Sequence, residues 1–172
     1  MSFNSIKSKT QSGRGFTIVE LLIVIVVIGI LAAITIVAYN GVTARANTTS
    51  SKSAANSFAK KAEIYNADGT TNKYPDTAAL ITSAASTATW SLTGVTANYS
   101  GAAVTTAPTG NSANSTIRVA KCGTATNTTQ ANITATNITG LNVYAWDFSA
   151  NAEATAISVG TVTGTGVACP AS

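Results

Sequence analysis

Glu20 is a carboxylate placed at the start of a long apolar run, since no charged side chain occurs in residues 21–44. An unpaired carboxylate at the edge of hydrocarbon is costly, so we expect a cationic partner. Cleavage of the bond between Gly15 and Phe16 would supply one, because Phe16 would then carry a positive α-amino group. Glu20 would lie about one helical turn from this amine, or could reach that of a neighbouring copy. On Glu20 alone, a signal anchor with its carboxylate among lipid headgroups is the simpler interpretation.

The other residues that could perform chemistry form no constellation. The chain has no histidine, and its six acids are scattered. We find no glycine-rich phosphate loop and no cluster with metal-ligand spacing, and a Ser or Thr nucleophile would have only lysines as candidate bases. We therefore predict no catalytic residues, no metal and no cofactor, and interpret the chain as a substrate of enzymes rather than as an enzyme.

The apolar run is long enough to span a bilayer. Residues 21–38 are apolar except for Gly29 and Thr35, and eighteen residues of helix rise about 27 Å, close to the thickness of the hydrocarbon layer. β-branched residues dominate the run and favour a strand. In lipid, however, an isolated segment satisfies its backbone groups only as a helix. We therefore predict a membrane-spanning helix over residues 16–40.

Residues 1–14 are polar and hold three cations and no acid. A basic flank before an apolar run indicates an N-terminus in the cytoplasm and a C-terminus outside. A secretory signal peptide would place its cleavage site after the apolar run. Cleavage at Ala32 or Ala33 would instead cut a stretch that continues apolar to Ala38.

The residues GFTIVELLIVIVVIGILAAI, 15–34, resemble the prepilin signature of type IV pilins and the related pseudopilins. In that family a prepilin peptidase cuts after the Gly that ends a short basic leader. The next residue, usually Phe, is N-methylated, and a Glu follows four residues later. The resemblance implies removal of residues 1–15 and N-methylation of Phe16. It covers about 25 of the 172 residues.

The resemblance also implies a homo-oligomeric helical filament at the cell surface. Its partners would be the prepilin peptidase, the inner-membrane assembly platform and, before assembly, the cytoplasmic membrane. The amine of Phe16 in one subunit would neutralise Glu20 of the next. Family pilins often have Pro near position 37, which this chain lacks, so we expect local unwinding nearer Gly29. The residues expected to act in assembly are Phe16, Glu20, Leu21, Leu22, Ile25, Ile28 and Leu31.

Past the membrane, the pattern predicts an extracellular domain over residues 41–172. The helix is expected to continue over 41–68, because small and aromatic residues recur at spacings of three or four and Asp68-Gly69 supplies a stop. A short helix is expected after Pro75, through residues 78–80. The residues of the apolar helical face are Ala54, Ala55, Phe58, Ala62 and Tyr65.

A sheet is predicted over about residues 88–169, from short β-forming runs separated by Gly, Asn and Thr. We read it as an antiparallel sheet whose apolar face covers the helix, which gives an α+β fold. The expected strands are 89–92, 95–99, 115–121, 142–148 and 155–162. The expected core aromatics are Phe58, Tyr65, Trp90, Tyr99, Tyr144, Trp146 and Phe148.

Cys122 and Cys169 fit an extracellular location. A bridge between them would close a loop of about 48 residues and stabilise the domain by about 4 kcal/mol in chain-entropy models. The alternative is two free thiols, since the spacing matches no metal or CxxC motif. We predict the disulfide.

Three function classes stay open. The first is a structural subunit, the major pilin of a type IV pilus for adhesion, motility or DNA uptake. The second is a pseudopilin or minor pilin of a type II secretion or competence system, and the third is a membrane-anchored domain that never polymerises. The net charge of +4 supports nucleic-acid binding only weakly, because removal of the leader leaves seven cations against six acids, a net charge of +1.

Overall fold

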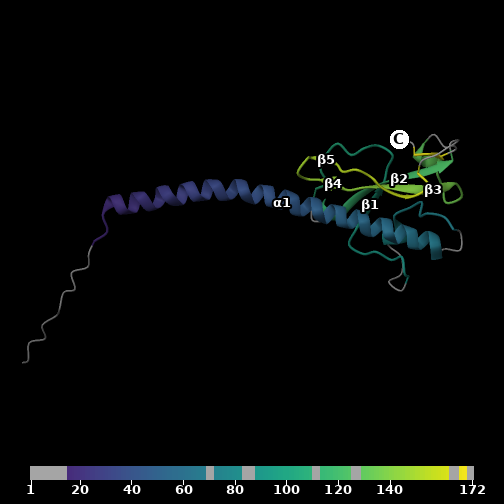
Figure 1. Cartoon of the computed structure of the whole chain (residues 1–172), viewed down its shortest axis with the longest axis horizontal. Helices are drawn as coiled ribbons and strands as arrows, with labels where there is room; N and C mark the ends of the chain where they lie inside the picture. Colours follow the sequence, from purple (N-terminus) through teal and green to yellow (C-terminus); the bar gives the residue numbers. More distant parts are fainter. Residues whose placement is uncertain are drawn as a thin grey trace, which may run out of the picture. The chain divides into compact units, whose positions relative to one another are not determined.

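The long helix α1, Ile18–Asp68, begins close to the N-terminus (Figure 1). The computed structural model describes residues 15–68, 72–82, 88–109, 113–124, 129–162 and 167–169. The predicted leader, residues 1–14, and the predicted helix stop at Gly69 lie outside these residues. Contacts divide the chain into two units, Met1–Asn40 and Gly41–Ser172, which we describe separately.

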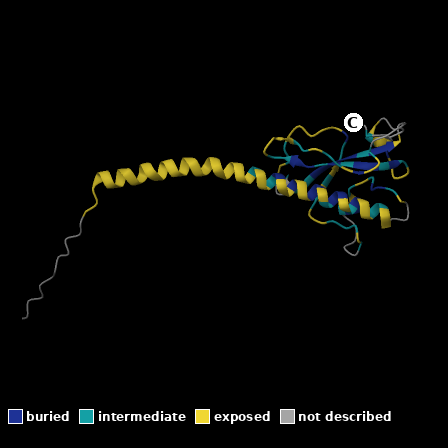
Figure 2. Cartoon of the chain, viewed as in Figure 1, coloured by how far each residue is buried: buried dark blue, intermediate teal, exposed yellow. Residues whose placement is uncertain are grey.

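In the first unit, α1 is apolar and nothing covers it. Every described residue up to Asn40 is exposed (Figure 2). By length and composition, α1 is the one helix among the described residues that could cross a membrane. An apolar helix without neighbours requires a bilayer or other copies of the chain to cover it.

In the second unit, α1 buries one face. The buried residues recur at spacings of three and four, as expected for one side of a helix (Figure 2). They include Ala54, Ala55, Phe58 and Ala62 of the predicted face. Thr48, Ser51 and Ala59 are buried as well. The helix ends at Asp68, and the predicted short helix follows as α2, Ala79–Thr82.

The sheet has the order β1-β2-β3-β6, and β7 pairs with β2. Figure 1 labels β1, β2 and β3 of this sheet. The strands β4 and β5 form a separate two-stranded hairpin. Short 3₁₀ turns, η1 and η2, precede β2 and β3. The bounds are β1 Thr96–Tyr99, η1 Ala113–Ser115, β2 Thr116–Thr124, η2 Gln130–Asn132, β3 Ile138–Tyr144, β4 Trp146–Asp147, β5 Ala152–Glu153, β6 Ile157–Gly160 and β7 Val167–Ala168.

These elements confirm the α+β class, but the sheet is mixed rather than wholly antiparallel. β1 and β2 are parallel, with Thr96 beside Thr116, whereas the other pairs are antiparallel. An antiparallel pair can be joined by a tight turn, but parallel neighbours need a long return connection. The described part of this connection is residues 100–109 and 113–115. The spacing of the β-forming runs did not reveal that β1 and β2 run in the same direction.

One predicted strand is absent, and another is wrong in extent. Residues 89–92 contain no strand, because this segment packs on helices rather than in the sheet. Trp90 meets Tyr65 edge to face at 5.6 Å between ring centroids, and the Leu92 N–H donates to the Ile81 carbonyl at 3.1 Å. The strand predicted over 142–148 starts earlier and breaks at Ala145, between β3 and β4.

The core is mainly aliphatic, contrary to the predicted aromatic core. Phe58 and Trp146 are buried, and Tyr99 packs on Phe58 edge to face at 6.4 Å. Tyr144 lies on the opposite sheet face from Val143, because side chains alternate along a strand. The aliphatic core residues are Ile81, Ile117, Val119, Ile133, Ile138, Leu141, Val143 and Val159.

Candidate functional site

A capping box stabilises the N-terminus of α1. Thr17 precedes the first helical residue, and its N–H and hydroxyl both donate to Oε2 of Glu20, at 2.8 and 2.7 Å. In return the Glu20 N–H donates to Thr17 Oγ1 at 3.2 Å. This reciprocal pairing satisfies backbone donors that have no partner within the helix. The negative charge of Glu20 also lies where the helix dipole favours it.

The cap engages only one oxygen of Glu20. Both donors from Thr17 reach Oε2, and no described residue donates to Oε1. The donors are neutral, so these hydrogen bonds leave the negative charge of the carboxylate uncompensated. The Thr-x-x-Glu spacing is a capping-box signal in the sequence, but Glu20 was interpreted by its charge alone and the cap was not predicted.

The predicted cleavage site lies in exposed, non-helical chain just before α1. Phe16 is 86% exposed. A Cβ added at Gly15 would meet no atom within 4 Å, and Gly15 has no positive φ. The fold of this chain therefore does not require glycine at this position. A requirement for glycine here would have to come from another molecule.

The predicted assembly residues of α1 form an open apolar surface. Gly29 lies among them, and a Cβ added to it would also meet no atom within 4 Å. The structure brings none of these side chains against another described element. Leu21, Leu22, Ile25, Ile28 and Leu31 are between 53% and 62% exposed.

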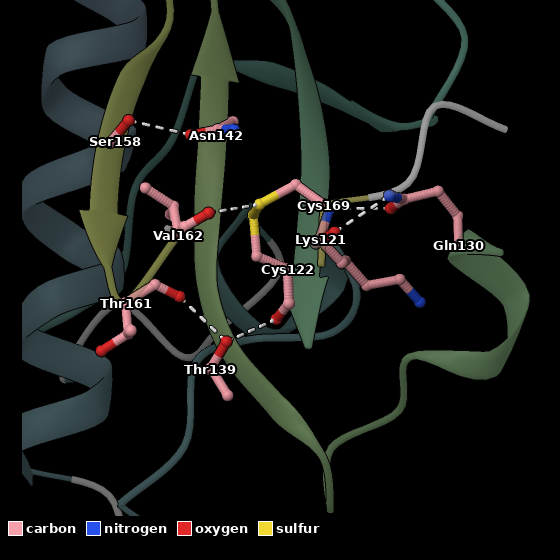
Figure 3. The surroundings of a disulfide bond; sticks show 9 residues. All are labelled: Lys121, Cys122, Gln130, Thr139, Asn142, Ser158, Thr161, Val162 and Cys169. Atoms are coloured by element: carbon pink, nitrogen blue, oxygen red, sulfur yellow. Dashed lines mark hydrogen bonds between the residues drawn. A yellow bond between two sulfur atoms is a disulfide. The ribbon is translucent and has the colours of Figure 1, made fainter. Parts of the chain in front are cut away.

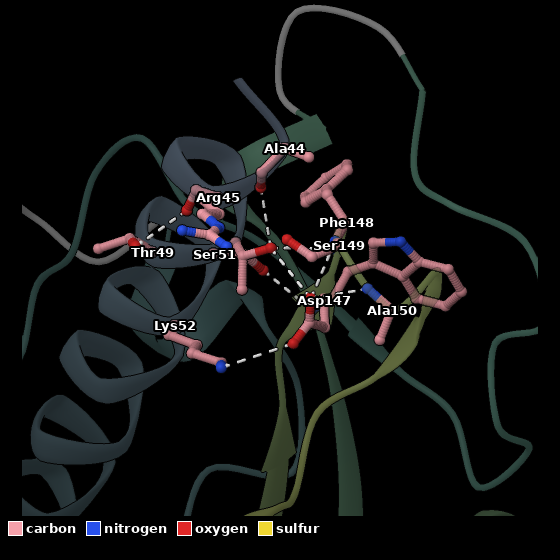
Figure 4. A network of polar contacts seen from close by, with 11 residues as sticks. Ala44, Arg45, Thr49, Ser51, Lys52, Asp147, Phe148, Ser149 and Ala150 are labelled. Atoms are coloured by element: carbon pink, nitrogen blue, oxygen red, sulfur yellow. Dashed lines mark hydrogen bonds and ion pairs between the residues drawn. The ribbon is translucent and has the colours of Figure 1, made fainter. Parts of the chain in front are cut away.

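In the second unit, a polar cluster joins α1 to the hairpin of β4 and β5 (Figure 4). The N–H groups of Trp146 and Phe148 donate to the hydroxyls of Ser51 and Thr48, both at 2.9 Å. Lys52 forms an ion pair with Asp147 at 3.7 Å. No periodic pattern in the sequence indicated these contacts, which join residues far apart in the chain.

Asp147 organises this cluster. Its Oδ1 accepts the N–H groups of Ala150 and Ser149, at 3.1 and 2.9 Å, and lies 3.2 Å from the Thr48 hydroxyl. The Ala150 N–H holds the pKa of Asp147 below its ordinary value, and Ser149, Thr48 and Lys52 act in the same direction against the effect of burial. The charged form of Asp147 therefore belongs to the folded state.

Cys122 and Cys169 form a disulfide in the structure (Figure 3). Cys122 is buried on β2, and Cys169 follows β7, which pairs with the end of the same strand. Thr139 of β3 lies within hydrogen-bond distance of the carbonyls of Cys122 and Thr161. The pairing of β7 with β2 and the disulfide of Cys169 thus attach residues 167–169 to β2. Among the described residues, no group of three or more Cys, Asp or Glu side chains could hold a metal ion.

One comparison with known proteins bears on the start of α1. A family model described as the prokaryotic N-terminal methylation motif matches residues 11–36. The match contains the Gly15–Phe16 bond, the capping box and the apolar surface up to Ile36. No solved structure matches the chain. This chain belongs to the proteins that carry the type IV prepilin signature.

Proposed function

We propose that the chain is a structural subunit, the major pilin, of a type IV pilus. The observation that carries this proposal is the uncovered apolar surface of α1 directly after the methylation motif. Full burial of a large aliphatic side chain is worth about 1.5–3 kcal/mol, so a bundle of such helices would be strongly favoured. The proposed filament serves adhesion, motility or DNA uptake, driven by a motor ATPase in the cell.

The proposed order of events starts in the membrane. The chain inserts with its N-terminus in the cytoplasm, and the peptidase removes residues 1–15 and N-methylates Phe16. The assembly platform then moves the helix from lipid into the filament core. Gly29 is the residue where α1 would yield during this transfer, because glycine is the weakest helix former in the span.

In the proposed filament, Oε1 of Glu20 receives the α-amino group of Phe16 from an adjacent subunit. The cap supports this pairing, because Thr17 holds Oε2 and so fixes the direction of the carboxylate. A charge-assisted hydrogen bond at this point also sets the axial register between copies.

The test is to produce the full chain in a bacterium with a prepilin peptidase and pilus platform but without its own major pilin. We expect long surface filaments, seen by electron microscopy, whose subunits begin at methylated Phe16 by intact-mass measurement. Short fibres that contain few copies would instead identify a pseudopilin or minor pilin. A chain that keeps Met1 and stays in the membrane would contradict the proposal in both forms.

A further inference from the structure

A pocket of about 380 Å³ opens on the sheet face that points away from the α1 core. Thr96 and Asn98 line it from β1, and they alternate with Ala97 and Tyr99, which pack against the core. Val104 and residues 106–109 of the return connection line another side, and the hairpin of β4 and β5 contributes Trp146 and Glu153. Its volume is within the range of small-molecule sites.

The charges of this pocket are already paired. Arg118 donates to both oxygens of Glu153, at 2.6 and 2.7 Å, and lies over the ring of Tyr144 at 3.8 Å. It also donates to the carbonyl of Ser100 at 3.0 Å. No other residue that lines the pocket is ionised. A charged ligand would meet no uncompensated partner, so the lining favours a neutral ligand.

The remaining polar groups have unused hydrogen-bonding capacity. Thr96, Asn98 and Thr106 are exposed at the pocket, and their side chains make no hydrogen bond to a described residue. Hydroxyl and amide groups both donate and accept, and they complement ligands whose groups do the same. Groups of this kind, spread over several sides of one pocket, match a ligand with several hydroxyls.

Trp146 adds an independent observation. It lines the pocket, is only 3% exposed, and its buried indole N–H has no acceptor among the described residues. A buried donor without a partner is destabilising, and such groups are uncommon in folded proteins. The nitrogen itself has less than 1 Å² of accessible surface, so an oxygen of a bound ligand would supply the missing acceptor only after a shift of the indole.

We propose that this pocket binds a neutral polyhydroxylated ligand, a single sugar unit, with Asn98 and Thr106 as its hydrogen-bonding residues and Trp146, after a shift of its indole, as the third. This site is separate from the assembly surface of α1, so it does not depend on the function proposed above. The sugar could be free or the end of a polysaccharide, and the two sources share the same chemistry.

The experiment is nuclear magnetic resonance of the full, ¹⁵N-labelled chain in a detergent without a sugar headgroup. The probes are glucose, galactose, mannose and N-acetylglucosamine, each also as its methyl glycoside and as a homodisaccharide, with glucuronate as the charged comparison. We expect at least one neutral probe to shift the Trp146 indole N–H in a saturable manner and to leave that of Trp90 unchanged. A methyl glycoside or disaccharide that binds as well as the free sugar identifies a polysaccharide end, and a preference for the free sugar identifies a monosaccharide.

Variants of the pocket distinguish binding at this site from non-specific binding elsewhere on the protein. Asn98→Ala and Thr106→Val change exposed side chains, and each should weaken binding about tenfold, the effect of one lost hydrogen bond. Asn56→Ala, an exposed position on α1 outside the pocket, should leave binding unchanged. The proposal is overturned if no neutral probe shifts Trp146, if glucuronate binds equally well, or if the pocket variants bind like the wild type.

Discussion

At the residue scale, the two carboxylate oxygens of Glu20 have different hydrogen-bonding roles. Oε2 closes the capping box with Thr17, whereas Oε1 is the oxygen proposed to meet the Phe16 amine of another subunit. Glutamine can also serve in a capping box, but it carries no charge. Substitutions of Glu20 can therefore distinguish the capping hydrogen bonds to Thr17 from the proposed ion pair with another subunit.

We predict that Glu20→Gln preserves membrane insertion and leader cleavage but sharply reduces incorporation into filaments. The amine of the neighbouring subunit would be buried without its partner, at a cost of about 3–5 kcal/mol. Thr17→Val, which weakens the cap but keeps the charge, should reduce incorporation less. Quantitative blotting of sheared filaments measures the effect. Glu20→Gln filaments at the wild-type level would show that the charge is dispensable.

A second prediction at this scale concerns Gly15. Because a Cβ added at this glycine meets no described atom within 4 Å, Gly15→Val should leave the fold unchanged and block cleavage by the peptidase. Intact-mass measurement should find the uncut precursor, with Phe16 unmethylated. Gly29→Ala is the matched control and should be processed normally. A Gly15→Val chain that matures to Phe16 would contradict the proposed processing.

At the scale of elements, the junction of α1 with the β4 and β5 hairpin should respond to acid. The folded pKa of Asp147 is depressed, so its contribution to stability is complete above the unfolded value of about 3.9. This contribution is lost as pH falls through the lower, folded pKa. We predict that Asp147→Asn lowers the melting temperature at pH 7 and reduces its loss on acidification.

Thermal unfolding of the full chain in detergent, followed at pH 7 and near pH 3, measures this difference. Asp68→Asn, at the exposed end of α1, is the control for general removal of one negative charge. If Asp147→Asn and the wild type lose the same stability between the two pH values, Asp147 has no part in the acid response.

A second prediction at this scale concerns Gly140, where β3 pairs closely with β6. A Cβ added at Gly140 would lie 2.5 Å from the Val159 carbonyl oxygen and 2.9 Å from that of Thr161. These are backbone atoms that cannot move aside cheaply, so Gly140→Ala should destabilise the second unit by about 1–3 kcal/mol. Gly41→Ala, where a Cβ meets nothing within 4 Å, should not. Chemical denaturation of both variants would decide the matter, and equal midpoints would contradict the packing argument.

At the scale of the molecule, the Cys122–Cys169 bridge should dominate the stability of the second unit. The bonded residues are separated by 47 positions, and closure of such a loop contributes about 4 kcal/mol in chain-entropy models. We predict that peptide mapping without reductant finds the two cysteines linked, and that reduction lowers the melting temperature. Recovery of both thiols freely alkylated from surface material would refute the bridge.

The sequence predicted those features that recur at short range. The apolar run, the three-and-four spacing on α1 and the short β-forming runs are repeating patterns, and they gave the α+β class. The cluster around Asp147 has no such pattern, because Thr48 and Ser51 resemble any polar helix residue. The parallel pairing of β1 with β2 was equally invisible, since the pattern within a strand does not tell in which direction its neighbour runs. The capping box at Thr17, by contrast, has a recognisable Thr-x-x-Glu pattern in the sequence, but it was not predicted.

The contacts that hold α1 against the hairpin also determine when the second unit can fold. Ser51 accepts from the Trp146 N–H across 95 positions of sequence, and Thr48 accepts from Phe148 across 100. Contacts between such distant positions form slowly. The entropy of closing a large loop is lost before the contacts can stabilise the fold. The Ser51 and Thr48 hydroxyls of α1 therefore lack these partners until residue 148 has been synthesised.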